Sequence, residues 1–222
     1  MLGLGNSMMT GGAPSEWLPS EESSLIGWWR SATGITHDAT AVSQWDDQSA
    51  EDNHAEQSVS DEKPTWESPN THIDFDDSDH LDLSSQITIT GVMTLGLKFN
   101  VAGDSTIIGD DSSNNEMIKV VSNGNFRVKN NNANKTWTTS TNFKDAIRYV
   151  VVTRDGSNNV NVWLDGVDQG SKTQGGNYLI DTIGKRKGST TDQLNGDLYE
   201  IVIFTATSAD LTTNLNKHLK NI

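Results

Sequence analysis

Apolar residues concentrate in three short runs in the last third of the chain, 147–153, 160–166 and 198–204. Each run is rich in β-branched and aromatic residues, which favour β-strands. In the second run Val160 and Val162 alternate with Trp163, which therefore points to the opposite face of the strand. The pattern predicts that the three runs are strands that assemble the core. It leaves open whether the face that carries Trp163 is also covered.

The rest of the chain repeats short apolar segments separated by turn residues. Asn123-Gly124 is typical of a tight hairpin, because both residues tolerate positive φ. Turns recur at a spacing of roughly eight to twelve residues, which is typical of β-sandwiches. The pattern therefore predicts an all-β fold. Further candidate strands lie at 25–29, 41–47, 87–90, 93–99, 106–109, 117–121, 126–129 and 178–183.

One helix is predicted, at the C-terminal end of the chain. Leu211, Leu215 and Leu219 recur at intervals of four residues and form one apolar face. Thr207 or Ser208 is the expected N-cap, because a side-chain oxygen at that position accepts hydrogen bonds from the first turn.

Length and composition fit one large all-β domain or two small ones, and they exclude several classes of function. The 222 residues are 33% hydrophobic, with 19 Gly, which fits many turns and polar outer faces. The formal net charge of −14 disfavours nucleic acid and anionic membranes as partners. Cysteine is absent, so disulfide and thiolate chemistry are excluded. We expect no secretory signal and no membrane insertion, because no segment has the necessary apolar length.

The segment 1–24 is rich in Gly, Pro and Ser and is predicted to be an extended arm ahead of a sandwich domain at 25–222. Two interpretations stay open. The arm is either a disordered terminus or an anchor whose apolar side chains bind a partner protein. The candidate partner-binding residues of the arm are Leu2, Leu4, Met8, Met9 and Trp17.

Several short motifs occur in a characteristic order over nearly the whole predicted domain. They are Gly27-Trp28-Trp29, Trp45-Asp46-Asp47, Arg154-Asp155-Gly156, Val162-Trp163-Leu164-Asp165-Gly166 and Gly196-Asp197-Leu198-Tyr199-Glu200. In this order the chain resembles the concanavalin A-like lectin/glucanase superfamily, and more narrowly the laminin-G-like modules of bacteriophage and bacterial surface proteins. Asp77 departs from the pattern, because relatives often carry Gly there. The resemblance implies a jelly-roll sandwich of two antiparallel sheets and no single activity. The Gly- and Met-rich arm resembles the start of a virion structural protein, so we expect display on a virion surface, which the protein reaches by host lysis.

The carboxylates are the candidates for a catalytic or a metal site. Hydrolases of this fold carry paired carboxylates on one strand, whereas Glu200 has apolar neighbours two positions away and is expected to face solvent or pair with a lysine. We therefore expect no enzyme. Laminin-G-like modules often hold calcium at a loop rim, and clustered Asp oxygens suit that ion. The candidate ligands are Asp104, Asp110 and Asp111, and an alternative cluster is Asp74, Asp76, Asp77 and Asp79. The competing interpretation is that these are solvated acidic loops.

Sugar binding would require an exposed aromatic ring beside hydrogen-bonding side chains. Trp137 next to Asn131, Asn132 and Asn134 is the candidate, with ordinary packing of the ring as the alternative. The sequence thus predicts a non-catalytic virion surface module that binds carbohydrate or the host surface. The alternative is a structural capsid or tail decoration protein attached through its arm to other virion proteins. Self-association, the glycan and the host stay open.

Overall fold

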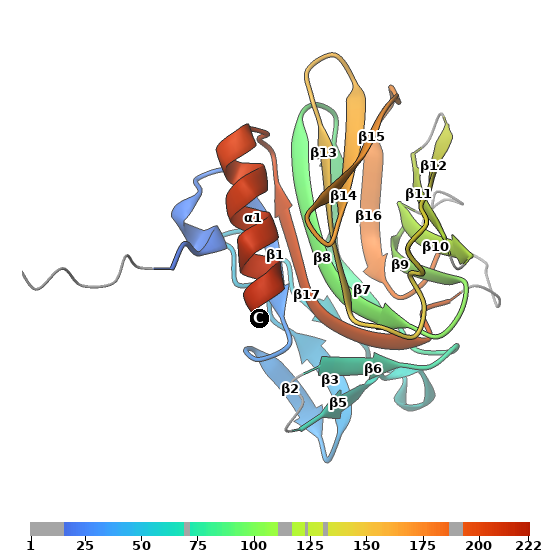
Figure 1. The fold of residues 1–222 in the computed structure, drawn as a ribbon. Coiled ribbons are helices and arrows are strands. Elements are labelled where there is room, and N and C mark those ends of the chain that lie inside the picture. The colour runs from blue at the N-terminus through green and yellow to red at the C-terminus, as the bar shows by residue number, and fades with distance from the viewer. Residues whose placement is uncertain (1–15, 69–71, 111–116, 123, 131–132, 187–192) are drawn as a thin grey trace, which may run out of the picture.

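The computed structural model describes residues 16–68, 72–110, 117–122, 124–130, 133–186 and 193–222. The described strands are joined in one continuous antiparallel sheet that folds over, so that two layers face each other (Figure 1); we call these layers the first and the second sheet. The first sheet has the order β1 (Leu25–Arg30), β17 (Gly196–Phe204), β8 (Met93–Val101), β13 (Arg148–Arg154), β14 (Asn159–Leu164) and β15 (Val167–Thr173). The second has the order β4 (Ala55–Glu56), β7 (Leu81–Ile89), β16 (Tyr178–Ile183), β9 (Ser105–Gly109), β10 (Ile118–Ser122), β11 (Asn125–Lys129) and β12 (Asn134–Thr138).

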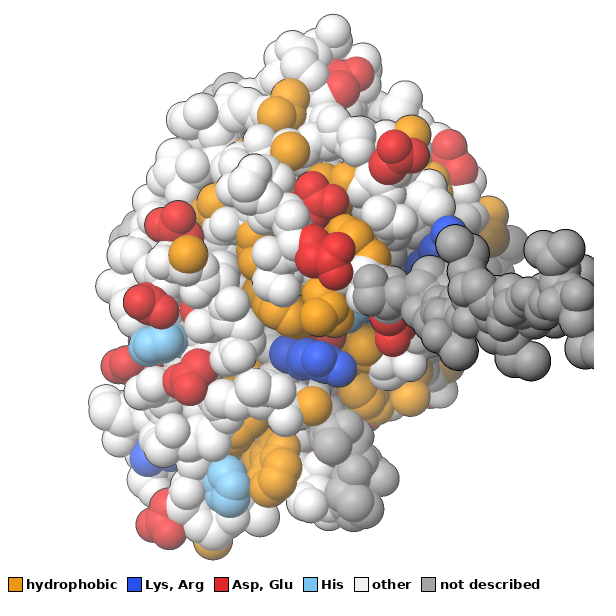
Figure 2. Space-filling model, turned by 90° about the vertical axis from the view of Figure 1, so that its left-hand side faces the viewer, with side chains coloured by type: hydrophobic (Ala, Val, Ile, Leu, Met, Phe, Trp, Pro, Cys, Tyr) orange, Lys and Arg blue, Asp and Glu red, His pale blue; other side chains and the backbone are white. Residues whose placement is uncertain are grey.

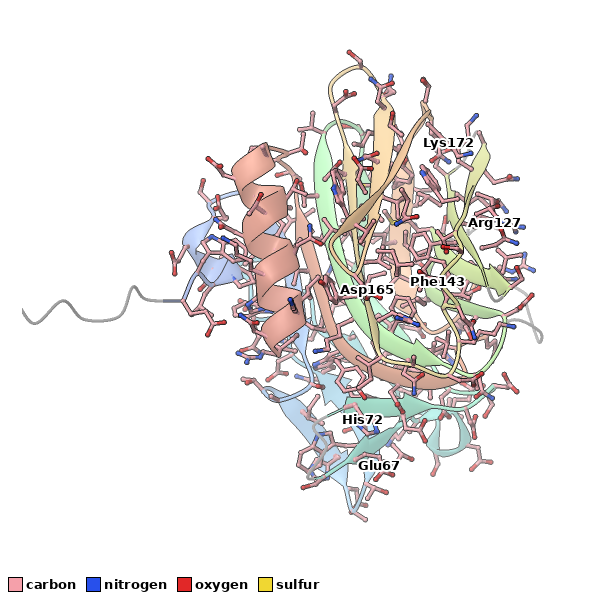
Figure 3. All side chains as sticks on the ribbon, in the orientation of Figure 1. Glu67, His72, Arg127, Phe143, Asp165 and Lys172 are labelled. Atoms are coloured by element: carbon pink, nitrogen blue, oxygen red, sulfur yellow. The ribbon has the colours of Figure 1, made fainter. Side chains whose placement is uncertain are left out.

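Four shorter strands connect the two sheets at one end of the molecule. They are β2 (Ile35–Asp38), β3 (Ala41–Trp45), β5 (Thr65–Glu67) and β6 (His72–Phe75). Strand β6 pairs with β17 of the first sheet, and β3 pairs with β4 of the second. In Figure 3 the labelled Glu67 and His72 mark this end of the molecule. The predicted all-β jelly-roll sandwich is therefore confirmed.

The core between the sheets follows the alternation that the sequence predicts. Val160, Val162 and Leu164 of β14 are buried, whereas Trp163 is half-buried on the opposite face. The same alternation on β8 buries Leu97 toward the partner sheet. Each fully buried aliphatic or aromatic side chain contributes about 1.5–3 kcal/mol, so this core is the main source of stability.

Helix α1 (Ala209–Asn221) covers part of the outer face of the first sheet. Its predicted apolar face, Leu211, Leu215 and Leu219, packs on Val151, Val202 and Phe204. Gly96 of β8 permits this contact, because a Cβ at that position would lie 2.9 Å from the ends of Leu215 and Leu219. The N-cap is Ser208, whose side chain accepts a 3.0 Å hydrogen bond from the Leu211 N–H. Among the described residues, no helix has both the length and the apolar composition to cross a membrane.

The end of the predicted arm lies against the sandwich. Residues Pro19–Glu21 form a short 3-10 helix, η1. The half-buried Trp17 donates a 3.2 Å hydrogen bond to Glu22, and its ring centroid lies 6.3 Å from that of Phe204 and 6.0 Å from that of His218. The described part of the arm, 16–24, is thus packed rather than extended, and Trp17 contacts its own domain. Leu2, Leu4, Met8 and Met9 lie outside the described residues.

Candidate functional site

Trp137 is not an exposed sugar platform. Its side chain is 2% exposed, and its indole N–H donates a 2.8 Å hydrogen bond to the carbonyl of Gly170. The ring fills the space between β12 of one sheet and β15 of the other, with the Lys172 ammonium 5.7 Å from its centroid. The prediction for Trp137 is therefore wrong, because a large aromatic ring is needed where these two sheet edges meet. Asn134 is exposed, and Asn131 and Asn132 lie outside the described residues.

The structure does not assemble the predicted calcium site from the residues that it describes. Asp104 forms a 2.9 Å ion pair with Lys144, whereas Asp110 is fully buried with Gln86 3.5 Å from its carboxylate. Asp111 lies outside the described residues. Within the described ranges, no three His, Cys, Asp or Glu side chains are placed to hold a metal ion. The ion pair with Lys144 accounts for the Asp104 carboxylate without a bound metal ion.

The alternative acidic cluster forms a turn before β7. Asp76 accepts hydrogen bonds from the backbone and hydroxyl of Ser78 at 2.8 and 2.7 Å, and these bonds lower the pKa of Asp76. Asp79 accepts a 3.0 Å hydrogen bond from the Asp76 N–H, and burial raises the pKa of Asp79 to about 6. The oxygens of Asp76 and Asp79 are thus bonded to the local chain, and the described residues of this cluster form no group that could hold a metal ion.

Glu200 lies under helix α1 and not in solvent, which corrects the prediction for this residue. The side chain is 0% exposed, and its Oε1 accepts a 2.6 Å bond from the Trp28 indole and a 2.7 Å bond from Nε2 of His218. Nε of Arg30 lies 3.9 Å from Oε2. The hydrogen-bond partners of Glu200 are thus Trp28 and a histidine of α1. The predicted lysine neighbour is also present: Lys98 of β8 lies opposite Glu200 in the sheet, and burial lowers the pKa of Lys98 while the Glu200 carboxylate partly offsets that shift. The pair of Glu200 and His218 ties the last turns of the helix to the sheet.

A groove opens where the N-terminal end of the same helix crosses the outer face of the sheet. Its volume is about 410 Å³. One wall comes from neighbouring strands β13 and β14, and the other comes from the start of α1. We call it the Trp163 groove, and its lining residues are Thr153, Trp163, Thr207, Ser208, Ala209, Thr212 and Thr213.

Trp163 differs from the other tryptophans in its hydrogen bonding. The indole N–H groups of Trp17, Trp28 and Trp137 have acceptors, and those of the remaining three are buried. Among the described residues, none accepts a hydrogen bond from the indole of Trp163, which is half-buried at the groove. Trp163 therefore packs in part against the apolar cluster beneath α1, and in the groove it offers the rest of its aromatic ring and a donor that is open to a ligand.

Hydroxyl groups surround this ring. Thr153 is only 6% exposed, and its hydroxyl has no hydrogen-bond partner among the residues that the structure places. The Thr212 hydroxyl instead donates a 2.8 Å bond to the Ser208 carbonyl, which fixes the start of the helix. An aromatic ring with open hydroxyls at its edge is the chemistry that binds a sugar ring.

A second hollow of about 490 Å³ lies beside β3, β4 and β7, and none of its described lining residues is aromatic. Several of its polar groups are already bonded within the protein. Gln44 donates to Asp46 at 2.6 Å, Ser43 donates to the Thr36 carbonyl at 3.2 Å, and Gln57 lies 2.8 Å from His80. The Trp163 groove is therefore the better candidate.

The sequence contains part of the signal for this groove. Alternation along 160–164 places Trp163 away from the core, but the helix wall comes from residues 207–213, far along the chain. No local pattern indicates that the two segments meet.

Comparison with known proteins supports the fold. No protein-family model and no curated protein sequence matches this chain. A solved structure of Trypanosoma rangeli sialidase in complex with sialic acid aligns with a TM-score of 0.57 and 13% identity over 90% of this chain and 33% of the sialidase. This chain thus spans about a third of that enzyme.

Two binding domains show a similar likeness. Domain 4 of AbnA, a GH43 extracellular arabinanase from Geobacillus stearothermophilus in complex with arabinotriose, aligns with a TM-score of 0.60 and 13% identity over 86% of this chain and 98% of the domain. The botulinum neurotoxin serotype D ligand binding domain in complex with N-acetylneuraminic acid aligns with a TM-score of 0.61 and 15% identity. This alignment covers 89% of this chain and 51% of the neurotoxin chain. At these identities the likeness shows a shared β-sandwich fold.

Proposed function

We propose that this chain is a non-catalytic module that binds carbohydrate in the Trp163 groove. The observation that carries the proposal is the half-buried Trp163, with an indole donor that no described residue occupies, beside the open hydroxyl of Thr153. The fold adds support, because similar sandwiches were solved with sialic acid and with arabinotriose. The fold alone assigns no activity.

The position of Glu200 supports a binding role over hydrolysis. A catalytic carboxylate must reach the glycosidic oxygen or the anomeric carbon. Glu200 is instead fully buried beneath α1 and bonded to Trp28 and His218. It therefore belongs to the support of the helix.

The kind of module and its place in the cell or particle are also proposals. We propose a laminin-G-like module displayed on a virion surface, with residues 1–15 as the attachment to capsid or tail proteins. The support is the order of sequence motifs and the apolar composition of Leu2, Leu4, Met8 and Met9. Deleting residues 1–15 tests the attachment. The proposal requires loss of particle association while the sandwich stays folded, and retained association contradicts it.

A glycan array tests the binding proposal. The wild-type chain, Trp163→Ala and the matched control Trp66→Ala are compared, because Trp66 is also half-buried and lies outside the groove. Loss of the stacking surface and donor is expected to weaken binding at least about tenfold, equivalent to about 1.4 kcal/mol. The control is expected to bind like the wild type. Glycan binding that survives Trp163→Ala contradicts the assigned site, and a blank array from folded protein contradicts carbohydrate binding and favours a structural decoration role.

A further inference from the structure

Among the residues that the structure describes, those that line the Trp163 groove include no charged side chain. Four threonines, a serine, an alanine and the tryptophan form its walls. Lys, Arg and His, which pair with carboxylates and sulfates in proteins, are missing from this set. Sialic acid, in contrast, carries a carboxylate at neutral pH. The lining therefore offers hydrogen bonds and an apolar face but no counter-ion.

The helix terminus at the groove does not supply the missing positive charge. The first turn of a helix carries a partial positive charge on its free N–H groups, which attracts anions. In α1 the Ser208 side chain already accepts from the Leu211 N–H, and the carboxylate of Asp210 lies in the first turn. Asp210 opposes the partial charge, so a second anion gains little there.

The electrostatic field of the whole chain also disfavours an anionic ligand. The formal net charge of the chain is −14. Figure 2 views the side of the molecule that carries α1 and shows acidic side chains dispersed over it with few basic ones. An anionic ligand that enters the groove loses hydration and meets repulsion, and no cation compensates for either.

The polar groups that are open in the groove match uncharged hydroxyls. The Trp163 indole can donate to a sugar hydroxyl, and the threonine hydroxyls both donate and accept. The Thr153 hydroxyl has no hydrogen-bond partner among the described residues and is not enclosed by them, so a ligand hydroxyl can reach it and pair with it. Thr213 is exposed at the opposite wall.

We infer that the Trp163 groove selects a neutral sugar unit over a sialylated or otherwise anionic one. This inference rests on the proposed function. The apolar face of the sugar stacks on Trp163, and its hydroxyls pair with the indole N–H and with Thr153. The selectivity comes from the absence of a cation in the groove together with the nearby carboxylate of Asp210.

The test uses pairs of glycans with one backbone, in a neutral form and in a form extended by sialic acid. Binding is measured on the full chain for the wild type, Trp163→Ala, Trp163→Phe and Thr213→Lys, with circular dichroism to confirm folding. The wild type is expected to bind the neutral form at least about fivefold more tightly, with little dependence on salt. Trp163→Phe keeps a ring and loses the donor, so its affinity falls less than that of Trp163→Ala. Thr213→Lys introduces a cation and shifts the preference toward the sialylated form.

The outcomes separate the two proposals. Tighter binding of the sialylated form by the wild type, lost in Trp163→Ala, overturns the neutral preference and leaves the binding site in place. An unchanged preference in Thr213→Lys also counts against the charge argument. Equal binding by the wild type and Trp163→Ala overturns the site, and the inference falls with it. No binding of either form by folded protein overturns both.

Discussion

The buried pair of Glu200 and His218 gives the sharpest prediction about how the helix is held. Replacing His218 with Leu removes the 2.7 Å partner of a carboxylate that is 0% exposed. The carboxylate keeps its 2.6 Å bond from the Trp28 indole and the guanidinium of Arg30 at 3.9 Å. The perturbation thus leaves a buried charge that is partly compensated.

The magnitude follows from the burial of that charge. Breaking a buried pair by removing one partner costs about 3–5 kcal/mol. The bonds that Glu200 retains place the expected loss at the lower end, about 3 kcal/mol. For a domain of this size the melting temperature falls by about 2–4 °C per kcal/mol, so His218→Leu is expected to lower it by about 6–12 °C.

A double-mutant cycle tests the reasoning. Glu200→Gln keeps an acceptor for the Trp28 indole but removes the charge, so His218→Leu in that background should cost only about 1 kcal/mol. Urea unfolding of the four proteins at pH 7 then gives a coupling energy of about 2 kcal/mol. If the two substitutions add to within about 0.5 kcal/mol, the pair does not hold the helix as described.

Three further predictions concern stability. Gly96→Val places methyl groups where Leu215 packs, so it should lower the free energy of unfolding in urea by about 1–3 kcal/mol. The control Gly91→Ala, with no atom within 4 Å of its Cβ, should stay within about 0.5 kcal/mol of the wild type in the same assay. Burial raises the pKa of Asp79 from 3.8 to about 6, so the folded state holds a proton that the unfolded state releases, and stability should fall as pH rises from about 4 to about 6. This difference corresponds to at most about 3 kcal/mol, and screening by nearby solvent reduces it to about 1 kcal/mol. Asp79→Asn should therefore stabilise the protein above pH 6 and flatten the pH profile of urea unfolding, and an unchanged profile would contradict the assignment. Ser208→Ala removes the helix cap and should lower the unfolding free energy by about 1 kcal/mol, and a neutral effect would show that this cap contributes nothing.

Local patterns were sufficient to predict the elements of the fold. Period-two alternation placed Val160, Val162 and Leu164 on one face of β14, which the structure shows to be the core face, and the spacing of Leu211, Leu215 and Leu219 gave the buried face of α1. Both patterns arise from one face of one element, so no knowledge of partners is required.

The site depends on contacts between distant segments, and there the sequence misled. Trp137 beside an Asn-rich loop suggested an exposed ring, but the edges of two sheets meet at that point and bury it. Glu200 among apolar neighbours suggested solvent, but a helix that follows in the chain covers it and supplies His218. Trp17 suggested an anchor for a partner protein, yet its ring packs near Phe204 of its own domain. In each case the residue that covers the side chain lies on another helix or strand. The local pattern of hydrophobic and polar positions does not reveal that contact.

Nuclear magnetic resonance of the tryptophan indoles tests carbohydrate binding at Trp163 most directly. The chain has seven tryptophans, and the Trp163 indole signal is assigned as the one lost in Trp163→Phe. We expect a neutral glycan that binds on the array to move this signal in a saturable way, while the signals of the buried Trp29 and Trp45 stay in place. A glycan that binds without moving the Trp163 signal, or a folded protein that no glycan perturbs, would contradict binding in the Trp163 groove.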